Sequence, residues 1–294
     1  MTRRALLAAL SASLLRAAGR LPANRNVRWA LGSNLWNSFP RVPFTDILDV
    51  MRDTGFIGIR LTQFPRILDT YQMTASQLEK EVSRRNLHVI TISFNGPAHD
   101  PGRRAEMLDN ARKAMEFLRN FGADRLVVFS PSRAAGSGDA AFLAMCEGFN
   151  QLGELAGEMG FRAGLHNHLS QMVQDAAEVD RCMALTDPRL FWFSPDTAHL
   201  HLAGIDVVST LEKYKQRLMM ADYKDAKKVG PKLQDDIFDL GDGEIDFPGC
   251  HRILKSLAYK GWLCVDLDTA RQGPRASYER CGAYVVSKLE SIYV

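Results

Sequence analysis

The chain has 294 residues, of which 46% are hydrophobic, and it carries a formal net charge of +3 at neutral pH. This length and composition suit either two average domains or one α/β barrel with a large core, because such barrels run to roughly 250 residues as a single unit. No stretch reaches the roughly 18 consecutive apolar residues that a membrane span needs, so we expect no stable membrane insertion of the folded protein.

The first 25 residues have the build of an export signal. Arg3 and Arg4 precede an apolar run over 5–15, and small residues follow at 17–19. The adjacent arginines and the Ala-rich middle are typical of a twin-arginine signal, which exports folded proteins to the periplasm or beyond. The alternative is an amphipathic N-terminal helix. Removing residues 1–25 changes the formal net charge from +3 to −2, so we expect no nucleic-acid partner.

From Val27 onward, short apolar runs alternate with longer amphipathic segments, which is the pattern of βα units. The runs that we interpret as strands are 27–36, 56–61, 87–94, 125–130, 162–168, 190–196, 217–223 and 261–267. The segments that we interpret as helices begin near 43 and at 74, or span 103–121, 139–159, 175–185, 206–214, 247–257 and 277–289. Thr74 and Gln77 form a capping-box signal, and Gly122 follows a helix as a C′ glycine.

Eight βα repeats without a long low-complexity insert leave little room for a second domain. We therefore predict that residues 26–294 form a single (β/α)₈ TIM barrel. A doubly wound open sheet is the main competing fold. It is disfavoured because no Gly-rich dinucleotide-binding turn follows any of the first strands.

The predicted strand ends carry a series of polar residues. In a TIM barrel the loops that carry the chemistry converge at these ends. Strands five to eight end in His166 and His168, Asp196 and His199, Asp222 and Lys224, and Asp266 and Asp268. Strands one to three contribute Asn34, Trp36, Arg60 and Asn95. His166 and His168 are two residues apart, so on a strand they would face the same side.

Several aspartates gathered over an apolar barrel would repel one another unless a cation or a proton lies between them. A divalent ion held by one histidine and three aspartates would resolve that conflict. Mixed nitrogen and oxygen donors suit Mn²⁺, Mg²⁺, Co²⁺ or Zn²⁺. The alternative is that one or more of the aspartates caps a helix or pairs with Arg60 or Lys224, and for Asp268 we favour this alternative.

Six motifs in order also carry a family resemblance. They are 166–168 (HNH), 195–199 (PDTAH), 203–206 (AGID), 223–225 (YKD), 241–248 (GDGEIDFP) and 261–266 (GWLCVD). From about Val27 to the C-terminus the chain resembles the xylose-isomerase-like TIM-barrel superfamily. Within it, the chain is most similar to the sugar phosphate isomerase/epimerase branch, which includes inosose dehydratase and ketose 3-epimerases.

The resemblance implies one divalent metal held at the ends of strands five to eight. By position its ligands are His166, Asp196, Asp222 and Asp266, with Mn²⁺ as the expected ion. Two positions depart from the family pattern: Asp222 stands where a His is usual, and Asp266 stands where a Glu is usual. Arg60 stands where the second strand often carries an acid.

The reactions of that family begin with removal of a proton from a carbon next to a carbonyl or hydroxyl-bearing centre. The resemblance implies His168 and Asp266 as base and acid, and Lys224 as the group that holds an oxyanion. For His168 the alternative is a role in orienting Asp196. The residues expected to bind the substrate are Asn34, Trp36, Arg60, Asn95 and His199. Trp36 could stack on a sugar face, and the alternative for it is a position in the core or at the rim.

We therefore predict a sugar isomerase- or epimerase-like enzyme that acts by metal-assisted proton transfer on a small sugar or sugar derivative. One alternative is a lyase or dehydratase acting on keto-sugars or 3-keto-glycosides, and another is a sugar-binding barrel that has lost the metal site. A DNA-repair endonuclease would need a larger His and Glu cluster. The five cysteines include no CxxC pair, which argues against a zinc knuckle. The expected partner is a small sugar, with a homo-oligomer possible.

Overall fold

The computed structural model describes residues 21, 25–39, 41–62, 64–134 and 138–294. The export signal predicted for residues 1–25 therefore lies outside the described residues, apart from Leu21 and Arg25. Leu21 is buried and donates its N–H to the carbonyl of Gly55. Within the described ranges, no helix combines the length and the apolar character needed to cross a membrane.

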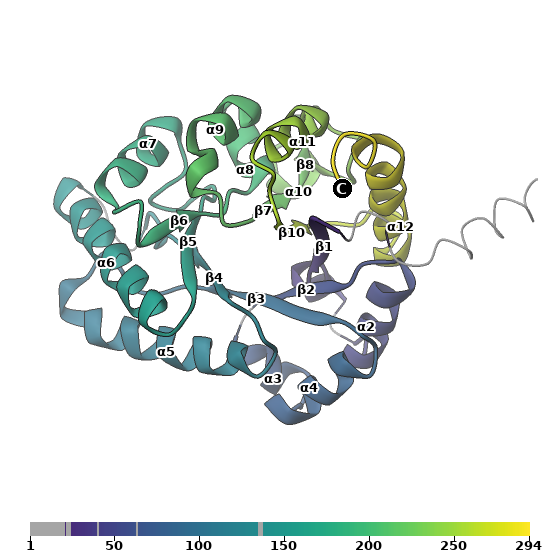
Figure 1. Cartoon of the computed structure of the whole chain (residues 1–294), viewed down its shortest axis with the longest axis horizontal. Coiled ribbons are helices and arrows are strands. Elements are labelled where there is room, and N and C mark those ends of the chain that lie inside the picture. The colour runs from purple at the N-terminus through teal and green to yellow at the C-terminus, as the bar shows by residue number, and fades with distance from the viewer. Residues whose placement is uncertain (1–20, 22–24, 40, 63, 135–137) are drawn as a thin grey trace, which may run out of the picture.

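Eight parallel strands form one curled sheet surrounded by helices (Figure 1). The strands are β1 (Val27–Gly32), β2 (Gly58–Leu61), β3 (His88–Phe94), β4 (Arg125–Phe129), β5 (Arg162–His166), β6 (Phe191–Phe193), β7 (Ala221–Tyr223) and β10 (Gly261–Val265). Their order in the sheet is β6-β5-β4-β3-β2-β1-β10-β7. Single parallel bridges, Phe193 to Leu218 and Asp196 to Asp222, join the two ends. The predicted (β/α)₈ barrel is confirmed.

The join between β6 and β7 is the least regular part of the ring. Pro195 has no backbone N–H to donate to a ladder, so the pairing is reduced there. The backbone N–H of Met219 donates to the carbonyl of Phe193, and that of Asp222 donates to the carbonyl of Pro195, both at 2.8 Å. This arrangement places Asp196 beside Asp222.

The helices largely follow the predicted pattern. They are α2 (Phe44–Asp53), α3 (Arg66–Thr70), α4 (Ala75–Ser83), α5 (Arg104–Arg119), α6 (Asp139–Glu158), α7 (Ala176–Leu185), α8 (Thr197–Leu202), α9 (Val207–Tyr214), α10 (Leu233–Asp236), α11 (Phe247–Ser256) and α12 (Pro274–Tyr284). The capping box of Thr74 and Gln77 is present, and Gly122 has a φ of +68° after α5. The short helices α3, α8 and α10 were not predicted, because each is too short to show a helical period.

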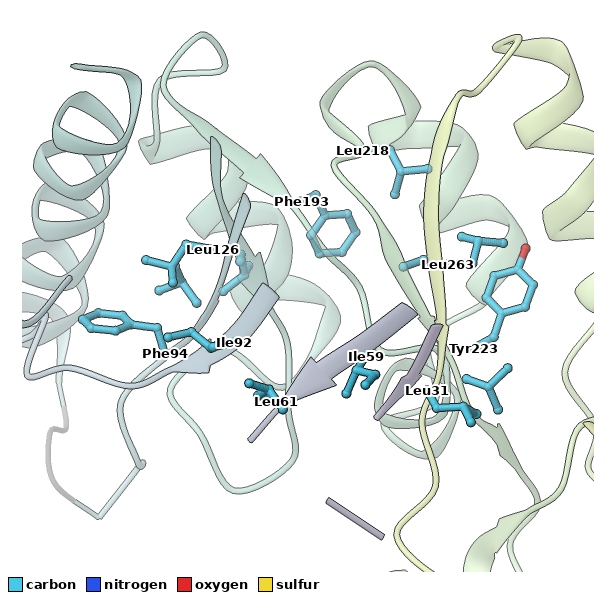
Figure 2. Close-up of a cluster of buried hydrophobic side chains, with 14 of the residues drawn as sticks. Leu31, Ile59, Leu61, Ile92, Phe94, Leu126, Phe193, Leu218, Tyr223 and Leu263 are labelled. Carbon is cyan, nitrogen blue, oxygen red and sulfur yellow. The ribbon is translucent and has the colours of Figure 1, made fainter. Parts of the chain in front are cut away.

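Strand residues alternate between two hydrophobic layers. The layer inside the barrel consists of Ala30, Ile90, Val127, Met219, Met220, Trp262 and Cys264. Their neighbours along the strands, such as Leu31, Leu126 and Leu263, pack outward with the helices (Figure 2). Because side chains alternate with a period of two, the strand residues that follow the inner layer point into the barrel mouth.

The segment after β7 contains a small hairpin that was not predicted from the sequence. Its strands are β8 (Asp225–Ala226) and β9 (Ile237–Phe238). The Asp225 carboxylate accepts N–H bonds from Ala226, Gly241, Gly243 and Ile245 at 2.8–3.2 Å. A Cβ at Gly243 would clash with this carboxylate. The Gly-Asp-Gly motif therefore closes this segment onto Asp225.

Replacing Asp225 by Asn is expected to loosen residues 226–246. The amide NH₂ would face backbone donors that now point at a carboxylate oxygen, and a buried donor without an acceptor costs roughly 1–3 kcal/mol. Urea unfolding should show about that loss of stability, and limited proteolysis should cut within 226–246 sooner than in the wild-type protein. Equal stability and equal cutting would show that the Asp225 contacts do not hold the segment.

His251 should make the fold sensitive to acid. It lies on α11, stacks on Trp29 at 5.8 Å between ring centroids and shares a 3.0 Å hydrogen bond with the Tyr223 hydroxyl. Burial lowers the pKa of His251 to about 4. The unfolded chain, whose imidazole titrates near 6.5, then binds more protons, so stability falls as the pH drops from about 6.5 to 4, by up to about 3 kcal/mol. Urea unfolding of His251→Phe across this range should show a shallower pH dependence. Parallel curves would contradict the assignment.

Candidate active site

A pocket of about 450 Å³ opens at the carboxyl ends of the strands. It is lined by Asn34, Arg60, Thr62, Phe64, Arg66, Ser93, Asn95, Phe129, His166, His168, Lys224, Asp266 and Asp268. The inward alternation explains this set, since Asp266 follows the inner residue Cys264 and His166 follows Gly164 along the same face of their strands. Most of the residues predicted from the ends of the strands therefore line one cavity.

A charge cluster includes part of the pocket lining and is buried except for Asp268. We use this name for Arg60, Asp196, Asp222, Lys224, Asp266 and Asp268. The Arg60 guanidinium bridges two carboxylates, with Nη1 2.6 Å from Asp222 Oδ2 and Nη2 2.8 Å from Asp266 Oδ1. The Lys224 ammonium lies 3.0 Å from Asp196, 2.7 Å from Asp266 and 3.1 Å from Asp268. Two fixed cations therefore face four carboxylates.

These contacts set the ionisation of the cluster. Burial opposes charge on Asp266, but Arg60 and Lys224 outweigh it and lower its pKa to about 2. Burial and the nearby charges of Asp266 and Asp196 raise the pKa of Asp222 well above its usual value. The pKa of Lys224 stays well above its usual value despite burial, because Asp196 and Asp266 stabilise the ammonium. The neighbouring cations therefore favour the ionised form of Asp266, and its role as the acid stays a prediction.

Asp196 serves two structures at once. Its Oδ1 accepts the N–H groups of Ala198 and His199 and so caps α8. Its Oδ2 has no hydrogen-bond partner among the described residues and faces Lys224, His166 and the Nε2 of His199 at 3.0, 3.7 and 3.8 Å. The capping alternative therefore holds for Asp196, while Oδ2 takes no part in the cap and its role as a ligand stays a prediction.

His166, Asp196 and Asp222 could together hold a metal ion, since one donor atom of each lies within 4.8 Å of the others. The Nδ1 of His166 donates to the carbonyl of Ser194 at 3.1 Å, which leaves a lone pair on Nε2. That lone pair faces Asp196 Oδ2 at 3.7 Å, so two buried electron-rich atoms oppose each other, with the Lys224 ammonium 3.0 Å from the same oxygen. A cation between them would relieve this repulsion, and the donor set fits an ion in that respect. Asp266, the fourth predicted ligand, is not part of this group.

His168 lies at the pocket wall with one nitrogen already engaged. Its Nδ1 donates to the carbonyl of Leu169 at 2.7 Å, so Nε2 keeps its lone pair in the neutral ring. Burial and the charge of Lys224 lower the pKa of His168, which keeps the ring neutral. His199 packs behind it, with ring centroids 3.6 Å apart, and its Nδ1 accepts the N–H of Leu169.

Two of the residues predicted to bind substrate do not line the pocket. Trp36 lies in the short 3₁₀ helix Asn34–Ser38 and is buried against Phe39 and Tyr278. His199 is fully buried on α8 and reaches the pocket only through His168. Asn34, Arg60 and Asn95 do line the pocket. Asn34 also donates to Asp268 at 2.8 Å. The Asp268 carboxylate therefore has two partners, Asn34 and Lys224.

The sequence reading missed five lining residues: Thr62, Phe64, Arg66, Ser93 and Phe129. Ser93 and Phe129 lie at the ends of β3 and β4, so the strand-end rule could have found them once those ends were known. Thr62 directly follows β2, and its hydroxyl lies 3.1 Å from that of Ser33. Phe64 and Arg66 belong to the loop and helix after β2, where no motif in the sequence marks them as residues of a pocket.

Residues 48–281 match the family model described as xylose isomerase-like TIM barrel. The chain belongs to that family. Its structure is also similar to solved members of the fold. A sugar phosphate isomerase/epimerase from Parabacteroides distasonis superposes with a TM-score of 0.72 at 17% identity, over 91% of this chain and 96% of that one. The IOLI protein, solved with a binding zinc atom, gives 0.73 at 14% identity, over 89% and 99%.

Curated relatives in this family include inosose dehydratases. The one from Bacillus velezensis is 29% identical over 218 residues, which cover 66% of this chain and 73% of that protein. The one from Halalkalibacterium halodurans is 32% identical over 166 residues, which cover 51% and 55%. The second match thus spans about half of that relative's length.

Proposed function

We propose that this protein removes a proton from a carbon next to a carbonyl in a small sugar or sugar derivative, in an isomerase- or epimerase-like reaction. The observation that carries the proposal is His168, whose unprotonated Nε2 belongs to a pocket that also holds Arg60 and Lys224. A base beside fixed positive charge suits carbanion chemistry, because the negative charge that develops on the carbonyl oxygen is stabilised there. The protein is a sugar-modifying enzyme, in keeping with its similarity to inosose dehydratases.

A divalent ion, with Mn²⁺ the first candidate, would be held by His166, Asp196 and Asp222. When bound, such an ion would polarise the substrate's oxygens and make the neighbouring carbon more acidic. His168 would take the proton on Nε2, and Lys224 would face the oxygen on which negative charge develops. Asn34 and Asn95, at the pocket wall, would orient hydroxyl groups of the substrate. Proton return to the opposite face or to the neighbouring carbon completes an epimerisation or isomerisation.

Elimination of water is the second candidate, favoured by the similarity to inosose dehydratases. It shares the first step, in which the C–H bond breaks and His168 takes the proton. The bond from the β-carbon to its hydroxyl group then breaks, and that hydroxyl leaves as water after taking up a proton. The two candidates therefore differ only in the fate of the deprotonated sugar.

An exchange experiment tests both. The purified protein is incubated with Mn²⁺ in D₂O with ketoses, inososes and 3-keto-glycosides, and products are followed by NMR and mass spectrometry. Deuterium uptake without loss of mass supports the isomerase or epimerase, whereas loss of water supports the dehydratase. EDTA should suppress either outcome. Absence of both reactions across the panel would contradict the proposal and leave the sugar-binding alternative.

We also propose that residues 1–25 direct export, which rests on the pattern of Arg3, Arg4 and the following apolar run. Replacing both arginines by lysine should block passage through the twin-arginine route, since that route reads the arginine pair. Cell fractionation of the wild-type and double-variant chains measures this. Equal amounts of both proteins in the exported fraction would contradict it.

A further inference from the structure

The alignment of neighbouring strands positions the Arg60 side chain between two carboxylates. Its guanidinium is only 2% exposed and reaches Asp222 and Asp266 with separate nitrogens. The register between β2 and β3 shifts at Ile59 and Arg60, and such irregularities re-aim side chains. Gly32 pairs with Arg60 across β1 and β2, and a Cβ there would clash with the Asp266 oxygen that Arg60 binds. The alignment of β1, β2 and β3 therefore positions Arg60 for both ion pairs.

Arg60 and a divalent ion would compete for the same carboxylate, that of Asp222. Asp222 belongs to the group that could hold an ion, yet its Oδ2 is already 2.6 Å from Arg60. Arginine keeps its charge at any pH that a protein experiences, so the guanidinium cannot yield by losing a proton. In a buried site two positive charges a few ångströms apart repel strongly. An ion would therefore bind only if Arg60 gave up part of its hold on Asp222.

We propose that Arg60 is a built-in counter-ion that competes with a divalent ion for Asp222, holding the carboxylates together without an ion and weakening the binding of one. The inference rests on the metal group of the proposed function and not on its reaction. It predicts that the chain folds with the charge cluster intact after metal is removed. It also predicts that removing the guanidinium turns His166, Asp196 and Asp222 into a tighter metal site.

The test measures metal binding without any sugar. The full chain is stripped with EDTA, dialysed and titrated by calorimetry with Mn²⁺ and, separately, with Zn²⁺. Arg60→Gln should bind each ion at least tenfold more tightly than the wild-type protein. Arg66→Gln, which removes an exposed arginine from the same pocket, is the matched control and should stay within about twofold of the wild type. In EDTA the melting temperature of Arg60→Gln should lie below that of the wild type and rise on adding the ion.

Arg60→Lys extends the test if the glutamine variant does not fold. It keeps one positive charge, but a single ammonium cannot bridge Asp222 and Asp266 as the planar guanidinium does. Its affinity for both ions should also exceed that of the wild type. Equal or weaker binding by the folded Arg60 variants, or absence of binding in every variant, would overturn the inference. Equal or weaker binding by the Arg60 variants leaves the proposed reaction untouched, whereas absence of binding in every variant would also remove the ion from it. The proton exchange assay, run separately on the wild-type protein, tells the two failures apart.

Discussion

Lys224→Met is expected to cost the protein about 3–5 kcal/mol of stability and to abolish sugar-dependent proton exchange. The ammonium contacts Asp196, Asp266 and Asp268, and only Asp268 has appreciable solvent exposure. Removing one partner of a buried ion pair leaves carboxylates charged, desolvated and repelling one another, which is the reason for a loss of that size. Urea unfolding at neutral pH measures the stability, and deuterium exchange with the sugar panel measures the activity.

Lys255→Met is the control for this change. It makes the same substitution at an exposed position of α11, and its stability should stay within about 0.5 kcal/mol of the wild type. If Lys224→Met were also that stable, the Lys224 contacts would contribute little, and Arg60 alone would balance the cluster. If it were destabilised yet kept normal exchange, Lys224 would have a structural role only.

The sequence predicted which side chains gather at the barrel mouth where a single rule decides their placement. Side chains along a strand alternate, and parallel strands of a barrel end at one rim, so His166, Asp222 and Asp266 had to face the same mouth once their strands were assigned. The pairing partners of those side chains do not follow from that rule. Arg60 reaches Asp222 and Asp266 because of a register shift in β2 and the absence of a side chain at Gly32. Both features depend on how neighbouring strands align.

The prediction that Trp36 binds the substrate failed for a similar reason. It follows the end of β1 and looked suited to stack on a sugar, but the chain turns there into the 3₁₀ helix Asn34–Ser38. That turn directs the indole toward Tyr278 of α12, more than 200 residues away in the sequence. Packing between distant segments, and not the local pattern, decided its position. The hairpin of β8 and β9 was missed for a related reason, because the side chain of Asp225 holds the segment that follows it.

His168→Gln is expected to lower proton exchange by about 100-fold or more while leaving the fold intact. A positioned general base contributes roughly 10²–10⁴ in rate, and the lone pair on Nε2 of His168 is set by the bond from Nδ1 to Leu169. Glutamine retains a side chain that can hydrogen-bond but offers no basic nitrogen. The measurement is the rate of deuterium uptake at saturating substrate, with the melting temperature recorded to confirm folding.

His201→Gln supplies the matched comparison, because His201 is half-buried on α8 and its nearest acidic partner is Glu244, outside the pocket. It should exchange at the wild-type rate. A folded His168→Gln protein that exchanges within about threefold of the wild type would remove His168 as the base. His168 would then be left with the positioning role beside His199 and Asp196. A large loss of exchange in both variants would instead indicate that α8 as a whole sets the geometry of the pocket, since His199 on that helix packs against the ring of His168.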